Sequence, residues 1–215
     1  MKALEALREL SELAAAQWGL VTTAQAARRG VSRLHLSRLA GAGHLERVGQ
    51  GVYRAAGVPA DRFENLKAAW LSVAPKLTAE ERLRQTPLDA VVSGAAAAWL
   101  HGVGDLVPEP YEFTVPSRQQ TQRRQLRFRV RKLPAGSVTL REGLPVTTVE
   151  QAIADLVEAR TDRSLVANVL ADAGGVDPAR LAELLAPHAA RNGFASGEAF
   201  RDHLDRLAHP MSKGV

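Results

Sequence analysis

The sequence predicts an α+β protein of two domains, and three observations support this. A helix, a tight turn, a second helix and a two-stranded hairpin follow one another over residues 18–54, in the order of a winged helix-turn-helix. Segments with strand-like alternation of apolar and polar residues lie within residues 111–148, and helical apolar spacing continues from residue 149. We therefore predict a winged helix-turn-helix over residues 1–57. A larger mixed α/β domain with a helical C-terminal third is expected over residues 58–215.

The N-terminal domain begins with two predicted helices. Leucines at helical spacing give the first helix one apolar face, which we expect to pack behind the next helices or against the second domain. These leucines are Leu4, Leu7, Leu10 and Leu13. A short second helix is expected over residues 24–29. Either Thr22 or Thr23 can be its N-cap, because a threonine hydroxyl accepts hydrogen bonds from the free N–H groups of the first helical turn.

A tight turn and a capped helix complete the helix-turn-helix. Gly30 supplies the backbone conformation that a sharp turn between two helices requires, and Ser32 is the expected N-cap of the helix over residues 33–42. Short β-type runs at residues 45–48 and 52–54 are separated by a Gly-Gln-Gly tripeptide, which is a hairpin signal. The same pattern also fits a small α+β unit whose two helices simply pack together, and we favour DNA binding over that alternative.

The elements of the second domain follow from the apolar pattern. They are a helix from about residue 63 to Pro75, a turn-prone segment with a short helix over 77–87, a buried alanine-rich helix over 94–101, strands over 111–115, 126–132 and 146–148, and helices from 149 onward. Ser93 is placed to cap the alanine-rich helix.

The second helix of a helix-turn-helix enters the major groove, where its first turns meet base edges. Arginine can donate two hydrogen bonds to guanine, which is the commonest base-specific contact. Leu34 could touch a thymine methyl group or belong to the core, and the sequence leaves both open. The candidate DNA-contacting residues lie on both helices and the hairpin: Thr22, Thr23, Ser32, Arg33, His35, Ser37, Arg38, Arg47, Gln50 and Arg54.

Charge is unevenly distributed along the chain, whose net charge is +5. The net charge is +4 for residues 1–59, −3 for 60–112, +8 for 113–141 and −4 for 142–215. The +8 segment defines a possible second basic surface, made of Arg118, Arg123, Arg124, Arg127, Arg129, Arg131 and Lys132. With a strand period of two, Arg127, Arg129 and Arg131 share one face of the 126–132 segment. The other, core-forming face is shared by Leu126, Phe128 and Val130. The basic face is expected to be solvated or paired with acidic residues of the same chain. The second interpretation is that these arginines contact DNA next to the operator, or RNA.

The sequence contains no convincing catalytic, metal or cofactor site. Ser93 and His101 are eight residues apart, so on one helix they are separated by about 12 Å and cannot share a proton. Asp155 and Glu158 could share a helix face, but no acid or histidine cluster accompanies them. His35 has no histidine or cysteine partner at metal-ligand spacing, and no phosphate-binding glycine loop is present. We expect a protein that is not an enzyme, and the helical C-terminal third disfavours a nuclease.

Composition limits where such a protein can work. The chain has 215 residues and no cysteine, which excludes disulfides and thiolate metal sites. No apolar run approaches the roughly 20 residues of a bilayer span, and Glu5, Glu9 and Glu12 interrupt the N-terminal apolar stripe, unlike a signal peptide. We expect a cytoplasmic protein without membrane contact.

The order and spacing of several motifs resemble AbiEi-type antitoxins of type IV toxin–antitoxin systems. In the first domain the motifs are Gly19, Thr22, Gly30-Val31-Ser32, Leu36, Leu39, Gly43-His44-Leu45 and Gly51-Val52-Tyr53-Arg54. In the second domain they are Val92-Ser93-Gly94-Ala95-Ala96-Ala97, Leu100-His101-Gly102, Glu112-Phe113-Thr114-Val115-Pro116, Gly143-Leu144-Pro145-Val146-Thr147-Thr148 and Asp155-Leu156. The resemblance covers most of residues 15–160.

This resemblance implies a DNA-binding autorepressor of its own operon that opposes a nucleotidyltransferase-like toxin, without requiring a stable complex with it. Two alternatives stay open. One is a regulator of other genes with a ligand- or protein-sensing second domain. The more remote one is an enzyme that processes nucleic acid.

Overall fold

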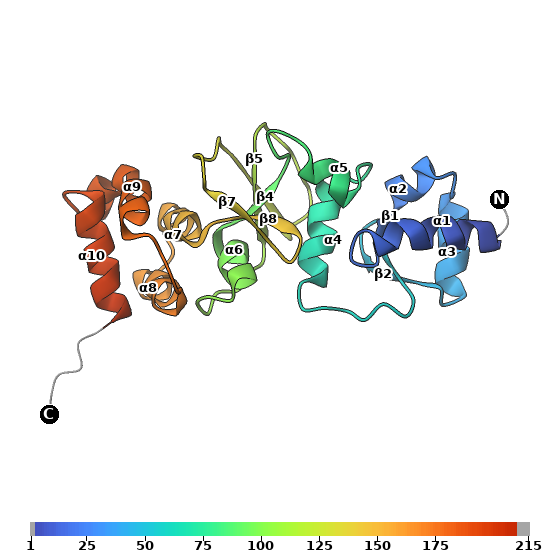
Figure 1. Cartoon of the computed structure of the whole chain (residues 1–215), viewed down its shortest axis with the longest axis horizontal. Coiled ribbons are helices and arrows are strands. Elements are labelled where there is room, and N and C mark those ends of the chain that lie inside the picture. The colour runs from blue at the N-terminus through green and yellow to red at the C-terminus, as the bar shows by residue number, and fades with distance from the viewer. Residues whose placement is uncertain (1–2, 210–215) are drawn as a thin grey trace, which may run out of the picture. The chain divides into compact units, whose positions relative to one another are not determined.

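The computed structural model describes residues 3–209 and divides into two compact units, Met1–Ala90 (unit 1) and Val91–Val215 (unit 2) (Figure 1). The sequence places the end of the winged domain at residue 57. The structure adds residues 58–90 to the same compact unit, and a separate winged domain ending at residue 57 stays a prediction.

Unit 1 is the predicted winged helix-turn-helix, extended by two helices. Its elements are α1 (Ala3–Ala15), β1 (Leu20–Thr22), α2 (Thr23–Arg28), α3 (Arg33–Gly41), β2 (Leu45–Gly49), β3 (Val52–Ala55), α4 (Glu64–Val73) and α5 (Ala79–Leu83). The hairpin β2–β3 is the wing, and β1 adds to it as a third, antiparallel strand in the order β1-β3-β2. Strand β1 was not predicted from the sequence, because it is only three residues long and buried throughout, so that no alternation of apolar and polar residues marks it.

The predicted caps position the helix-turn-helix. Thr22 caps α2: its hydroxyl accepts from the Gln25 N–H at 3.0 Å, and the Gln25 side chain accepts from the Thr22 N–H at 2.9 Å. Ser32 caps α3 by accepting from the His35 N–H at 3.3 Å. Gly30, between the two helices, has a φ of +77°, a conformation that glycine adopts at little cost. Leu36 and Leu39 of α3 are buried in the core of unit 1.

Residues after the wing hold the helix-turn-helix in place, which explains why unit 1 continues past residue 57. The Thr22 hydroxyl donates to the Pro75 carbonyl, and the Gln25 amide donates to the Leu77 carbonyl at 2.7 Å. The Ala79 N–H donates to the Gln17 side chain at 3.2 Å. These bonds satisfy polar groups that would otherwise be buried without partners.

Unit 2 is a mixed sheet with helices. Its elements are β4 (Val91–Ser93), α6 (Gly94–His101), β5 (Tyr111–Val115), β6 (Leu126–Val130), β7 (Val138–Arg141), β8 (Leu144–Thr147), α7 (Val149–Glu158), α8 (Arg163–Asp172), α9 (Pro178–Ala189), the 3₁₀ turn η1 (Ala190–Asn192) and α10 (Gly197–Ala208). The strand order is β6-β5-β4-β8-β7. The pairs β4–β8 and β5–β6 are parallel, whereas β4–β5 and β7–β8 are antiparallel.

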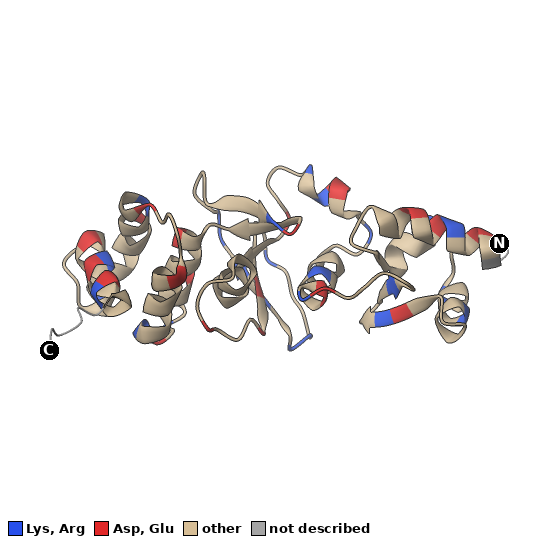
Figure 2. Cartoon of the chain, turned by 60° about the horizontal axis from the view of Figure 1, so that its bottom comes forward, with Lys and Arg blue, Asp and Glu red and all other residues tan. Residues whose placement is uncertain are grey.

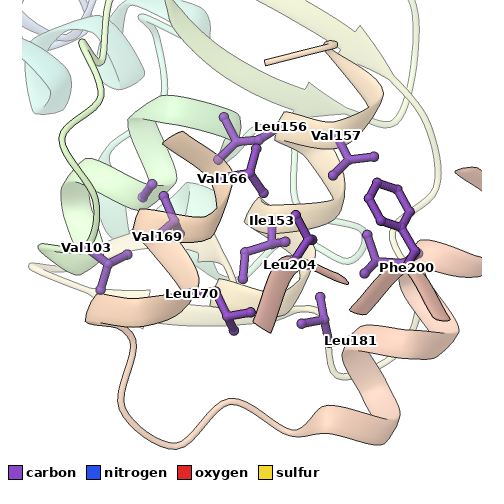
Figure 3. Packing of buried hydrophobic residues seen from close by; sticks show 12 residues of the cluster. Val103, Ile153, Leu156, Val157, Val166, Val169, Leu170, Leu181, Phe200 and Leu204 are labelled. Carbon is purple, nitrogen blue, oxygen red and sulfur yellow. The ribbon is translucent and has the colours of Figure 1, made fainter. Parts of the chain in front are cut away.

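The helical C-terminal third has its own apolar core. Ile153 of α7 lies among side chains of α8, α9 and α10, including Val166, Leu181 and Leu204 (Figure 3). This confirms the helical spacing read after residue 149.

Two local expectations for unit 2 are wrong. Ser93 precedes α6 but makes no cap hydrogen bond; instead the first helical N–H, of Gly94, donates to the Asp155 carboxylate at 3.3 Å. The apolar side of the 126–132 segment is not a core face either. Because β6 lies at the sheet edge, Leu126 and Phe128 are only half-buried and Val130 is 52% exposed.

Candidate nucleic-acid interface

The exposed side chains of α3 and the wing form one candidate interface in unit 1. On α3, Arg33, Ser37 and Arg38 are exposed, and Leu34 is 58% exposed and therefore not part of the core. On the wing, Arg47 and Gln50 are exposed. We call these six residues the reading surface.

The wing turn is tied to the helix-turn-helix. Thr23 is half-buried, and its hydroxyl donates to the Gly51 carbonyl at 3.3 Å. The Arg47 Nε donates to the Gly49 carbonyl at 3.3 Å, which leaves the terminal nitrogens of its guanidinium without a protein partner among residues 3–209. The hairpin thus presents Arg47 and Gln50 from a supported turn.

Lysines and arginines lie on the helices and the hairpin of unit 1 (Figure 2), and ion pairing separates the arginines into two groups. Arg28 is paired with Glu81 at 3.1 Å, and Arg29 with Glu9 at 3.3 Å. In contrast, Arg33, Arg38 and Arg47 make no ion pair within the part of the chain that the structure describes. The positive charge of the reading surface is therefore not neutralised by neighbouring carboxylates.

Four predicted DNA-contacting residues have partners inside unit 1. Thr22 is buried and bonded to Gln25 and Pro75. Arg54 is only 14% exposed and pairs with Glu64 at 2.7 Å and with Glu46. The hydrogen bond to Glu64 outweighs burial and raises the pKa of Arg54. Ser32 and the half-buried His35 are bonded to each other, with the Ser32 Oγ 2.9 Å from the His35 Nδ1. Our DNA-contact proposal therefore rests on the reading surface and not on Thr22 or Arg54.

The second basic surface of unit 2 also divides into two groups. Arg129 and Arg131 of β6 and its extension pair with carboxylates of the same unit. Within the described residues, the other members have no carboxylate partner; these are Arg118, Arg123, Arg124, Arg127 and Lys132. The internally paired interpretation therefore holds for two of the seven residues.

The paired group forms a polar network at the edge of the sheet. The Arg129 Nε lies 3.0 Å from the Glu112 carboxylate, and Arg129 also pairs with Glu158. Arg131 bridges Glu158, at 3.1 Å, and Asp155, which is fully buried. Burial opposes the charge of Arg129, but Glu112 and Glu158 raise its pKa nevertheless. The carboxylates are thus neutralised by Arg129 of β6 and by Arg131, which follows it.

Of the two residues considered as a catalytic dyad, His101 has a hydrogen-bond partner, whereas the Ser93 hydroxyl has none among residues 3–209. His101 is held through its Nε2, 2.8 Å from the Thr147 carbonyl, and Ser93 is buried. Between residues 3 and 209 there is no cluster of three or more His, Cys, Asp and Glu side chains that could hold a metal ion. In the same range, no helix is both long and apolar enough to cross a membrane.

Several residues that hold the helix-turn-helix and the wing together were not predicted from the sequence. The side-chain amides of Gln17 and Gln25 bond to each other at 2.7 Å in the interior of unit 1. Glu46 and Glu64 neutralise Arg54. Of these residues, only Glu46 could have been predicted from the sequence, because it lies opposite Arg54 in the register of the hairpin.

The fold of unit 1 is that of a winged helix-turn-helix protein. Residues 8–56 match the family described as "Transcriptional regulator, AbiEi antitoxin", and residues 90–198 match "AbiEi antitoxin C-terminal domain". The chain belongs to the AbiEi antitoxin family. The resemblance inferred from the motifs is thereby confirmed.

A solved structure shares the fold. The crystal structure of the RV2827C protein from Mycobacterium tuberculosis is 18% identical, with a TM-score of 0.54, over 95% of this chain and 76% of that chain. At this identity the likeness concerns the fold alone. The comparison with curated proteins gives no match.

Proposed function

We propose that this protein is a cytoplasmic, non-enzymatic antitoxin of a type IV system that represses its own operon by binding operator DNA through the reading surface. The observation that carries this proposal is a contrast between arginines of unit 1. Arg33, Arg38 and Arg47 have no carboxylate partner among the described residues, whereas Arg28, Arg29 and Arg54 are paired. Unpaired guanidiniums on a capped helix and a wing are suited to guanine edges and phosphates.

The test is a titration of operator and scrambled DNA with the full chain. Arg33→Ala or Arg38→Ala should weaken operator binding by about 1–3 kcal/mol if the residue reads a guanine, with little loss on scrambled DNA. Arg84→Ala is the control, because Arg84 is an exposed arginine at the C-cap of α5, outside the reading surface. Unchanged operator affinity for both α3 variants would refute the assignment.

The free members of the second basic surface support a further contact with the phosphate backbone. Replacing Arg123, Arg124 and Arg127 by Gln should lower affinity equally on specific and random DNA. It should also flatten the salt dependence by about 0.9 units of slope per lost contact. An unchanged slope would assign these side chains to solvent.

We propose that unit 2 carries the antagonism toward a nucleotidyltransferase-like toxin, without a stable complex. Its separate sheet and helical core are far more than DNA docking requires. Growth rescue by residues 91–215, coexpressed with a nucleotidyltransferase-like toxin, would support this division. Rescue by residues 1–90 alone would contradict it.

A further inference from the structure

A cavity of about 390 Å³ in unit 2 lies where the turn between α7 and α8 meets η1. Val157 and Phe200, neighbours in the helical core, form its apolar floor (Figure 3). Three arginines, Arg160, Arg163 and Arg191, line it as well. We call this site the arginine pocket. Its volume falls in the range of small-molecule sites, roughly 300–1,000 Å³.

The charges in the arginine pocket are not balanced. None of its three arginines pairs with a carboxylate of the described chain. Asp162 is the one acidic residue that lines the cavity. Its Oδ1 already accepts from the Ser164 N–H at 2.8 Å and hydroxyl at 2.6 Å, as the N-cap of α8. The pocket therefore carries excess positive charge.

Two of the guanidiniums are held in position by neutral groups. Arg163 donates to the Asn192 carbonyl at 2.9 Å, and its guanidinium lies 5.2 Å from the centre of the Phe194 ring. Arg191 contacts the Nδ1 of His188. These contacts orient the charges without neutralising them, which reduces the entropy lost when a ligand binds.

Arg160 occupies a position where glycine would be least costly. Its φ is +59°, directly after the end of α7, where the Thr161 N–H donates to the Leu156 carbonyl. Such a left-handed helix end usually has glycine, because a Cβ there costs energy. Arg160 makes no side-chain hydrogen bond or ion pair within residues 3–209 that would compensate this cost.

A second cavity in unit 2, of about 440 Å³, differs in its charges. Its arginine, Arg201, is paired with Asp202 at 2.5 Å, and Asp205 lines the same cavity. Of these two cavities, only the arginine pocket is lined by arginines that have no carboxylate partner.

We propose that the arginine pocket binds a phosphoryl group, supplied by a free nucleotide or by the backbone of a single strand of nucleic acid. Guanidinium forks donate paired hydrogen bonds to phosphate oxygens. The apolar floor beside the arginines provides a contact surface for the sugar or base. This site lies wholly in unit 2, so it does not depend on DNA reading by α3.

The experiment is isothermal titration calorimetry of the full chain with three probes: inorganic phosphate, ATP and a short oligouridine. Arg160→Gln and Arg191→Gln should each weaken binding by about tenfold or more, since hydrogen bonds between charged groups are the strong ones. Arg160→Lys should retain part of the affinity. Arg206→Gln, an equal loss of charge on the exposed face of α10, should leave it within about twofold.

The probes distinguish the sources of the phosphoryl group. If ATP binding is lost in the pocket variants but not in Arg206→Gln, the ligand is a free nucleotide. If only oligouridine shows this pattern, the ligand is a single strand of nucleic acid. If no probe binds, or if all variants bind as the parent does, the proposal is wrong. Arg160→Gln is expected to keep the parent melting temperature because its side chain has no partner, so it carries the test even if Arg191→Gln misfolds.

Discussion

At the residue scale, single atoms decide where the chain can tolerate change. Gly197 at the start of α10 lies so close to α9 that an added Cβ would be 2.0 Å from the Ala182 carbonyl oxygen. The atom in the way belongs to the backbone and cannot rotate aside. Gly174, in contrast, has open space around it and no left-handed conformation.

We expect Gly197→Ala to lower the free energy of unfolding by about 1–3 kcal/mol or more, because α9 and α10 must move apart. Gly174→Ala should stay within about 0.5 kcal/mol of the parent. Urea unfolding monitored by circular dichroism compares the two. Equal stabilities would show that the helices separate without cost.

The histidines of unit 2 make stability depend on pH. Burial lowers the pKa of His101 below its usual 6.5, and burial also lowers the pKa of His188 and of His203. The unfolded chain, with histidine pKa values near ~6.5, then binds more protons than the folded one as the pH falls. Stability is therefore expected to decrease from pH 7 to pH 5, before the carboxylates titrate.

His101→Gln should reduce this pH dependence while retaining a donor for the Thr147 carbonyl. The measurement is the free energy of unfolding in urea at pH 7, 6 and 5. A slope identical to that of the parent would mean that His101 does not contribute.

At the element scale, β6 shows how one strand serves two purposes. Arg129 and Arg131 fasten this edge strand to Glu112, Asp155 and Glu158, whereas Arg127 extends into solvent. Charged side chains on an edge strand also discourage pairing with other chains.

Arg131→Gln should destabilise the protein by about 3 kcal/mol, because it leaves the fully buried Asp155 without its cation. Arg127→Gln, the matched change on the same strand, should cost less than about 0.5 kcal/mol. Thermal unfolding of both variants separates the two roles. Similar melting temperatures would argue against a stabilising network.

Local signals in the sequence predicted elements with distinctive caps and turns. Ser32, Gly30 and the Gly-Gln-Gly tripeptide gave α3 and the wing correctly, since their causes lie within a few residues. The short strands β1, β4 and β7 were missed, because three or four residues hold too little pattern. The partners of Arg54 and Arg131 come from distant segments, so no local rule predicts them.

At the scale of the whole molecule, the division into two units determines where the chain can be cut into stable fragments. The cut should fall between the compact units at residue 90 and not at the end of the wing. Residues 1–90 retain the Pro75, Leu77 and Ala79 groups that satisfy Thr22, Gln25 and Gln17. A fragment of residues 1–59 loses them and leaves polar groups in its interior unpaired.

We expect fragments 1–90 and 91–215 each to unfold cooperatively, and fragment 1–59 to be several kcal/mol less stable than 1–90, since each unpaired buried group costs about 1–3 kcal/mol. Thermal melts and operator titrations of all three fragments test this. A fragment 1–59 as stable as 1–90 would restore the boundary at residue 57.

The parallel pairing of β4 with β8 also sets an order of events during synthesis. Val92 pairs with Val146, so the central strand of unit 2 waits for nearly half of that unit to be translated. Unit 1 closes its three-stranded sheet between Leu20 and Ala55, and such shorter-range contacts form faster. The nascent chain therefore completes its winged helix while the sheet of unit 2 is still missing a strand, and the two units emerge as successive folding events.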